Sequence, residues 1–478
     1  MNSISRIRNN FFFLSAADFT AKSLGFLLYI VLARYLGPEQ FGIYSLGVSF
    51  WLIYGLLANI GFDPVIIRDV SRDTSKSESY FSQVVFYKLI TGTLAYLALL
   101  CTCFLMDYAI EVRNTILIFG CLLFINPLNS TQQSIFKAHQ TMNYVALMEA
   151  LRAIFKLAVV PVILAVGLGV QAVAGSHFII ALILFVIFYH FILKKYFCRF
   201  SFRDVKFNNP LFKSALPFGF LGLTYIVNRK LDILIISKMI GVESVGWYNA
   251  ANELVGILGI LPTTLSTVLF PSFSANYGRS ELSQLTNTAN FTIKLINVIG
   301  IPSGVGIFLL APEIINLVYG PNYSHSAIVL KILSPVICFL FARSVLSWLL
   351  TAVDQVNILM KIVILTLVIN ISIDILLIPH FGYAAAAIGV VVSTFFAYIS
   401  VCWYLRRRLE GLILFKSSIK PFLACLPMIA VLFICDDFYL FMKIGIAILV
   451  YLAATFLFSV FDKNEIEVIK KIVVPGQR

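Results

Sequence analysis

The residues of this chain that could do chemistry are ionisable side chains inside long apolar runs. Only 12% of the 478 residues are charged, while 60% are hydrophobic. A charge at the centre of a membrane helix costs about 2.5–3.5 kcal/mol, so each such side chain should face protein or a wet cavity. Ten of the 36 Lys and Arg fall inside the apolar runs. The acids placed there are fewer: Asp18, Glu149, Asp232, Glu253 and Asp374.

The excess of cations predicts an interior that holds an anion, because Arg and Lys suit phosphate and carboxylate oxygens. Lys331, Lys361 and Asp374 lie near helix ends, where long side chains reach water, and are not candidates. The candidate ligands of an anion are Lys22, Lys88, Arg152, Arg229, Lys230, Lys294 and Arg343.

Some of these charges are spaced so that they could pair along one helix. Asp18 and Lys22 are four residues apart, and Glu149 and Arg152 are three apart, so structural ion pairs are an alternative to binding. Arg229 and Asp232 could pair similarly. Lys88, Lys294 and Arg343 have no such local partner. The acids that could take up H⁺ or Na⁺ are Asp18, Glu149, Asp232 and Glu253.

Other chemistries lack their residues in this sequence. It contains no phosphate-binding GxxxxGK[ST] string, no Cys/His cluster with metal-ligand spacing and no convincing nucleophile beside a base. The eight Cys fall almost entirely in apolar runs and are expected to be free thiols. We therefore expect no enzyme, cofactor or metal. The net charge of +13 is interpreted as membrane topology and not as nucleic-acid binding.

The elements that must position these charges are membrane helices of about 20 apolar residues each. The expected class is an all-α integral membrane protein. The apolar runs predict about fourteen spans, near 11–33, 41–61, 80–106, 114–134, 143–167, 172–193, 213–237, 245–271, 287–310, 326–350, 356–378, 383–405, 416–435 and 438–461.

The connections between these spans alternate in positive charge. With the N-terminus inside, the inner connections hold 22 Lys and Arg and the outer ones hold four. This asymmetry follows the positive-inside rule and predicts that both termini are cytoplasmic. The basic segment 194–213 is expected on the inner membrane surface, where anionic lipids attract Lys and Arg.

A short block occurs twice, as ARYLGPEQFGIYSL (33–46) and SKMIGVESVGWYNA (237–250). At an offset of 204, Gly37 and Gly42 match Gly241 and Gly246, and further matches follow in order at offsets up to 213. Chance similarity among apolar helices is the alternative to duplication. Duplication predicts six-helix bundles at 1–205 and 206–410 and an added helix pair at 411–478. The four glycines are expected in tight turns that act near a gate.

Three stretches carry a family resemblance: ARYLGPEQFGIYSL, IINLVYGPNYSHSA and FGYAAAAIGVVVS. They resemble the bacterial polysaccharide-biosynthesis flippases, the Wzx-type O-antigen transporters of the MATE-like multidrug/oligosaccharidyl-lipid/polysaccharide superfamily. The resemblance implies two bundles that open alternately to either side. It also implies movement of a polyprenyl-diphosphate-linked oligosaccharide from the inner to the outer leaflet of the bacterial inner membrane. Membrane lipids, a glycan polymerase and a chain-length regulator are the implied partners.

Three alternatives remain open at this point. A multidrug exporter of the same superfamily would favour acids over cations in its cavity. A flippase of a lipid-linked peptidoglycan precursor would carry the same diphosphate. A non-transporting scaffold for glycan assembly would tolerate charge reversal inside the spans.

Overall fold

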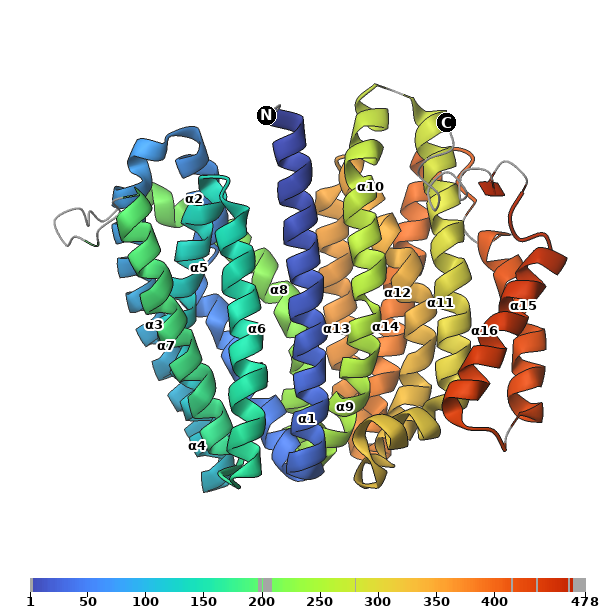
Figure 1. Cartoon of the computed structure of the whole chain (residues 1–478), viewed down its shortest axis with the longest axis horizontal. Helices are drawn as coiled ribbons and strands as arrows, with labels where there is room; N and C mark the ends of the chain where they lie inside the picture. Colours follow the sequence, from blue (N-terminus) through green and yellow to red (C-terminus); the bar gives the residue numbers. More distant parts are fainter. Residues whose placement is uncertain are drawn as a thin grey trace. The chain divides into compact units, whose positions relative to one another are not determined.

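The computed structural model describes residues 3–196, 200, 209–279, 281–413, 416–435, 437–462 and 465–466, and it leaves the side chains of residues 3–19 undescribed. Within these ranges the chain consists of α-helices, short 3-10 segments and turns (Figure 1). The helices are α1 (Ser3–Asn59), α2 (Phe62–Arg72), α3 (Ser77–Leu105), α4 (Ile110–Gly120), α5 (Leu122–Ala138), α6 (Met142–Ala165), α7 (Gly169–Tyr196), α8 (Asn209–Met239), α9 (Val242–Leu258), α10 (Ile260–Gly278), α11 (Leu282–Tyr319), α12 (Ser326–Ala352), α13 (Val356–Phe381), α14 (Ala384–Arg408), α15 (Lys416–Ile434) and α16 (Leu440–Leu457).

The all-α membrane architecture is confirmed. In the described part of the chain, twelve helical stretches are long and apolar enough to cross a membrane. Two features account for the difference from fourteen predicted spans. Helix α1 covers the first two predicted spans, 11–33 and 41–61. Its backbone breaks between them at Gly37 (φ 71°), before Pro38. Helix α6 matches the span predicted at 143–167 but carries three charged residues, Glu149, Arg152 and Lys156, whereas the apolar stretch of each of the twelve holds at most two.

The chain divides by packing into two units, Met1–Ala250 with Asp374–Tyr383, and Ala251–Ile373 with Ala384–Arg478. These units are defined by contacts, whereas the predicted bundles at 1–205 and 206–410 are defined by sequence repetition. The repeat boundaries therefore stay a prediction. Each unit is described separately below.

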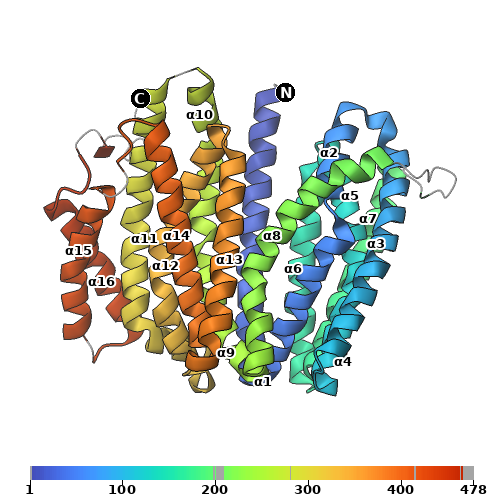
Figure 2. The same ribbon diagram turned by 180° about the vertical axis from the view of Figure 1, so that it is seen from behind.

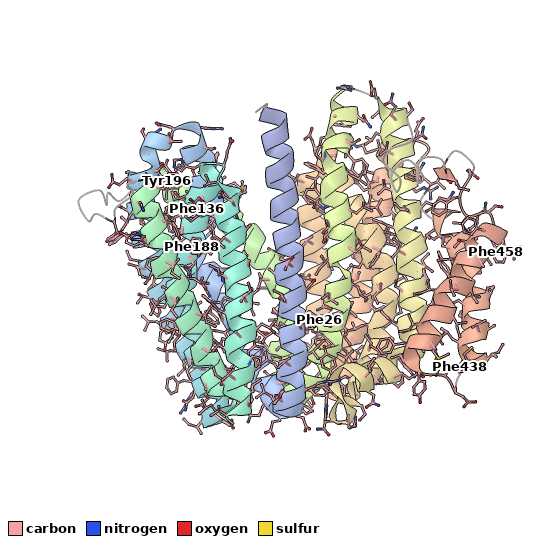
Figure 3. The ribbon with its side chains drawn as sticks, in the orientation of Figure 1. Phe26, Phe136, Phe188, Tyr196, Phe438 and Phe458 are labelled. Atoms are coloured by element: carbon pink, nitrogen blue, oxygen red, sulfur yellow. The ribbon has the colours of Figure 1, made fainter. Side chains whose placement is uncertain are left out.

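In the first unit, α1 packs against α3, α4, α6 and α8. Helices α3, α5, α6 and α7 run side by side in both views (Figures 1 and 2). An aromatic cluster closes one end of this bundle, where the Phe136 ring meets those of Phe188 and Tyr196 edge-on (Figure 3). Both phenylalanines are completely buried, so this cluster fixes α5 against α7.

In the second unit, α11 packs against α12 and α15, and α12 packs against α14. The added pair, α15 and α16, is joined to α11 by an apolar cluster that includes Met428 and Tyr451. An ion pair also links it, from Lys443 Nζ on α16 to Glu313 Oε1 on α11 at 2.8 Å. Only 4% of the Lys443 side chain is exposed, so the ammonium of this pair is buried.

Candidate functional site

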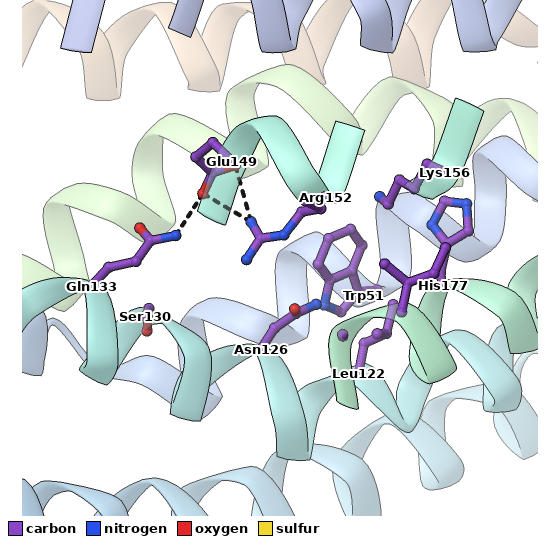
Figure 4. Close-up of a pocket in the computed structure, with 11 residues that line it drawn as sticks. Trp51, Leu122, Asn126, Ser130, Gln133, Glu149, Arg152, Lys156 and His177 are labelled. Carbon is purple, nitrogen blue, oxygen red and sulfur yellow. Dashed lines mark hydrogen bonds and ion pairs between the residues drawn. The ribbon is translucent and has the colours of Figure 1, made fainter. Parts of the chain in front are cut away.

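A polar cavity of about 180 Å³ lies inside the first unit, between α1, α5, α6 and α7. Side chains that line the cavity are spaced along each helix so that they share one face of it. Its walls combine charged, amide, aromatic and apolar side chains: Trp51, Leu122, Asn126, Ser130, Gln133, Glu149, Arg152, Lys156, His177, Ile180 and Ala181 (Figure 4).

Glu149 and Arg152 form the ion pair that their spacing allows. Arg152 Nη1 lies 3.0 Å from Glu149 Oε1, and Gln133 Nε2 donates to the same oxygen at 2.5 Å (Figure 4). The guanidinium is not saturated by this pairing, because its buried Nε has no partner among the described residues. Arg152 therefore keeps a donor for a ligand.

Lys156 and His177 lie beside each other at one end of the cavity (Figure 4). His177 is 3% exposed, and neither of its ring nitrogens has a hydrogen-bond partner in the described chain. Its ring meets Tyr44 and Phe119 edge-on. Sequence reasoning missed both residues. A lone His in an apolar run reads as a core residue, and Lys156 was counted inside a span without being chosen.

Lys88 lies beside this cavity but is not a free cation. Its side chain is fully buried, and its Nζ contacts Asp63 Oδ1 at 2.6 Å, the carbonyl oxygen of Pro127 at 2.9 Å and Ser130 Oγ at 3.0 Å. Sequence reasoning found no local partner for Lys88, because Asp63 belongs to α2 and is 25 residues away. Ser130 also lines the cavity, so one hydroxyl connects the two polar groups.

Asp63 is held in its charged form by this arrangement. Burial by itself raises the pKa of Asp63, but the Lys88 charge and the hydrogen bonds from Lys88, Asn59 and Ser130 outweigh it. The pKa of this carboxyl therefore lies below its usual value, and the ion pair is intact at neutral pH.

The other predicted cations are distributed over both units. In the first unit, Lys22 and Arg229 are exposed, and Lys230 is 8% exposed. Arg229 Nη1 donates to the phenol oxygen of Tyr225 at 3.1 Å. In the second unit, Arg343 is half-buried, and Lys294 Nζ pairs with Glu465 Oε2 at 2.6 Å. Lys294 thus also has a partner distant in sequence.

Among the predicted acids, Asp232 lies in a buried cluster of the first unit. Tyr248 donates to Asp232 Oδ2 at 2.7 Å, and the carboxylate of Asp374 interacts with that of Asp232. Asp374, which the sequence places near a helix end, is completely buried, and neither oxygen has a hydrogen-bond donor in the described chain. Glu253 is half-buried in the second unit. The Asp18 side chain lies outside the described residues.

Of the four repeated glycines, two have a left-handed backbone and the other two form a reciprocal contact within the first unit. Gly37 and Gly241 have φ of 71° and 136°, which only glycine adopts easily. A Cβ on Gly42 would overlap the carbonyl oxygen of Val242, and a Cβ on Gly246 would overlap that of Pro38. These two contacts are equivalent under the offset of 204.

A buried hydrogen bond continues the same relation. Asn249 Nδ2 donates to Ser45 Oγ at 3.0 Å, and these two residues are themselves 204 apart. The two copies of the repeat therefore pack against each other at equivalent positions. This is the arrangement that a pseudo-two-fold axis between the turns produces.

The family model described as polysaccharide biosynthesis protein matches residues 7–277, more than half of the chain. This chain belongs to the polysaccharide biosynthesis protein family. A second model, MatE, matches residues 217–376, so the family's fold is related to that of the MATE transporters.

Two relatives are similar to this chain over most of its length. The capsular polysaccharide biosynthesis protein CapF of Staphylococcus aureus is 20% identical over 83% of this chain and 99% of its own length. The probable flippase AglR of Haloferax volcanii is 24% identical, with 79% of each chain covered. A solved structure of the lipid II flippase MurJ in an inward closed conformation superposes with a TM-score of 0.75 at 18% identity, covering 93% of this chain and 98% of MurJ. The fold is therefore that of the MurJ and MATE structures.

Proposed function

We propose that this chain is a flippase that carries a polyprenyl-diphosphate-linked oligosaccharide from the inner to the outer leaflet by alternating access. The observation that carries the proposal is the positively charged cavity of the first unit, where Arg152 and Lys156 face one carboxylate, Glu149. A cavity of this charge between helices favours an anionic ligand. Membership of a polysaccharide biosynthesis family supports a saccharide cargo, and the name of AglR, a probable flippase, supports the flippase activity.

The same observation weighs against a multidrug exporter, because a cationic drug requires acids in its cavity. The other predicted cations are proposed to attract the diphosphate during its passage across the membrane; they are Lys22, Arg229, Lys230, Lys294 and Arg343. Lys88 is proposed to stabilise the packing of its helices through the Asp63 pair. Two negative charges moving outward would gain about 4–5 kcal/mol per 100 mV of membrane potential.

We place the reciprocal turns at the outer gate, with Gly37, Gly42, Gly241 and Gly246 permitting close approach. The distribution of Lys and Arg supports this placement, because it favours both termini on the cytoplasmic side of a bacterial inner membrane. A glycan polymerase and a chain-length regulator are proposed as the partners that receive the cargo outside.

The buried acids supply a site for ion coupling. Two interacting carboxylates that lack water cannot both stay charged without a shared proton or a bound cation, and Asp374 offers two oxygens without donors. We propose that Asp232 and Asp374 take up H⁺ or Na⁺ during the cycle. Glu149 and Glu253 are weaker candidates, since Glu149 is already paired with Arg152.

The decisive experiment measures on which leaflet the lipid-linked oligosaccharide resides in cells that lack this protein. The proposal expects the intermediate to accumulate on the inner leaflet, and wild type and Lys194→Gln to restore its export. Lys194 is an exposed cation at the end of α7, so it is a matched control for Arg152→Gln, which should restore export poorly. If leaflet distribution never depends on the protein, the scaffold or drug-exporter function replaces the flippase. If the accumulated lipid is a peptidoglycan precursor, the cargo assignment changes.

A further inference from the structure

The cavity between α1, α5, α6 and α7 carries a second kind of recognition besides charge. Trp51 presents an indole to it, and Asn126, Gln133 and Ser130 line it with amides and a hydroxyl (Figure 4). An aromatic face beside polar hydrogen-bonding groups matches a sugar, which has apolar C–H faces and a rim of hydroxyls. A bare phosphate would use the cations and leave the indole and amides without a role.

The unpartnered His177 fits the same ligand. A neutral imidazole offers one donor and one acceptor, and a sugar hydroxyl both donates and accepts. Both nitrogens of His177 are buried without partners in the described chain, and so is Nε of Arg152. Buried polar atoms are normally hydrogen-bonded, so these three atoms mark positions that a ligand would fill.

The charge of the cavity distinguishes between anions. Arg152 and Lys156 against Glu149 leave one net positive charge. The diphosphate of the proposed cargo carries about two negative charges, one on each esterified phosphate, and the adjacent Glu149 would repel this double charge more strongly than a single one. A carboxylate carries a single charge, and a guanidinium accommodates it through paired N–H donors.

The size of the cavity sets how much of the cargo it can take. Its volume of about 180 Å³ far exceeds what one ordered water needs. It is below the roughly 300–1,000 Å³ of pockets for drug-sized ligands. It therefore suits one ring, not an entire oligosaccharide.

We infer that this cavity binds one acidic sugar of the cargo, with Arg152 and Lys156 on its carboxylate, Trp51 against its ring and His177 on a hydroxyl. The inference rests on the proposed flippase function and adds to it the chemical class of the repeat unit. The cavity would then read the saccharide, while the diphosphate is held elsewhere.

The first test is the composition of the lipid-linked intermediate that accumulates in cells lacking the protein, determined by mass spectrometry. The expected result is a repeat unit that contains a carboxylated sugar. A repeat unit of neutral sugars alone would overturn the inference while the flippase function stands. If no lipid-linked intermediate accumulates, the proposed function fails, and the inference fails with it.

The second test uses the purified full-length protein with Trp51 as its only tryptophan, obtained by replacing Trp247, Trp348 and Trp403 with Phe. Trp51 fluorescence is titrated with glucuronate, glucose and inorganic pyrophosphate. Glucuronate should bind at least about tenfold more tightly than glucose, since one charge-assisted hydrogen bond is worth that factor or more. Tighter binding of pyrophosphate than of glucuronate, or no response to any probe, would overturn the inference.

Variants separate the assigned roles in the same titration. Lys156→Gln should remove most of the preference for glucuronate over glucose, whereas the exposed control Lys194→Gln should keep it. His177→Phe keeps an aromatic ring beside Tyr44 and Phe119 and should weaken glucuronate and glucose by the same factor. A preference that survives Lys156→Gln unchanged contradicts the assignment of the carboxylate.

Discussion

Replacing Asp63 by Asn should destabilise the protein more than replacing its partner Lys88 does. The Lys88 side chain has no exposed surface, whereas one fifth of the Asp63 side chain is exposed. Asp63→Asn leaves a buried ammonium without its counter-charge. Lys88→Met removes the buried charge itself and leaves a carboxylate that still receives hydrogen bonds from Asn59 and Ser130.

The size of the effect can be worked from these contacts. Breaking a buried ion pair by removing one partner costs about 3–5 kcal/mol. Lys88 would keep its hydrogen bonds to the Pro127 carbonyl and Ser130, which places Asp63→Asn near the lower end, at about 3 kcal/mol. Lys88→Met should cost less, and the double variant should cost less than the two single changes added together.

The assay is equilibrium unfolding in detergent micelles, followed by tryptophan fluorescence. Asp73→Asn is the matched control, because Asp73 pairs with Lys76 at 3.3 Å with both side chains about half exposed, and such a pair contributes at most about 1 kcal/mol. The reasoning is refuted if Asp63→Asn lies within about 1 kcal/mol of wild type, or if Lys88→Met proves the more damaging change.

The same pair predicts a dependence on pH. Because the folded-state pKa of Asp63 is lowered, its stabilisation is complete above the usual carboxyl value of about 3.9. It is lost as the pH falls through the lowered value. Unfolding measured between pH 7 and pH 3 should therefore show a smaller acid loss in Asp63→Asn than in wild type, and equal slopes would contradict this.

Three further predictions concern other parts of the molecule. Gly246→Ala should abolish export in the leaflet assay because its Cβ would overlap the Pro38 carbonyl, whereas Gly25→Ala, with open space around it, should export normally; export by both would exclude the close contact. Asp374→Asn should leave the protein folded but remove any dependence of flux on an H⁺ or Na⁺ gradient, and a flux that still follows the gradient would reject this site. Glu313→Gln should lower stability by about 3 kcal/mol, since it removes the carboxylate that pairs with the buried Lys443 ammonium, and unchanged unfolding would count against that pair.

The helices and the duplicated turns could be predicted from the sequence because both depend on local signals. Apolar length fixes the spans, and a glycine needed at positive φ recurs at Gly37 and Gly241. The Glu149–Arg152 pair was also accessible, since a spacing of three residues places both side chains on one helix face. Where the signal is local, sequence and structure agree.

The partners of Lys88 and Lys294 could not be predicted, because they lie 25 and 171 residues away and only tertiary packing brings them close. Asp374 was misjudged for a related reason. Its distance from a helix end suggested contact with water, but the neighbouring helices cover it completely. No sequence pattern marks His177 as a ligand, because the absence of partners for its two ring nitrogens in the described chain is a feature of the tertiary structure.

The reciprocal packing of Gly42 on Val242 and Gly246 on Pro38 limits how the two copies of the repeat can diverge after a duplication. Each glycine is matched to main-chain atoms of the other copy, which are present whatever the side chain. Pro38 and Val242 themselves differ, and mutation can change almost every residue around them without breaking the fit. A bulkier residue at either glycine, however, cannot be compensated by a substitution in the other copy. After a duplication, these two glycines would therefore be kept while the residues around them diverge between the two copies.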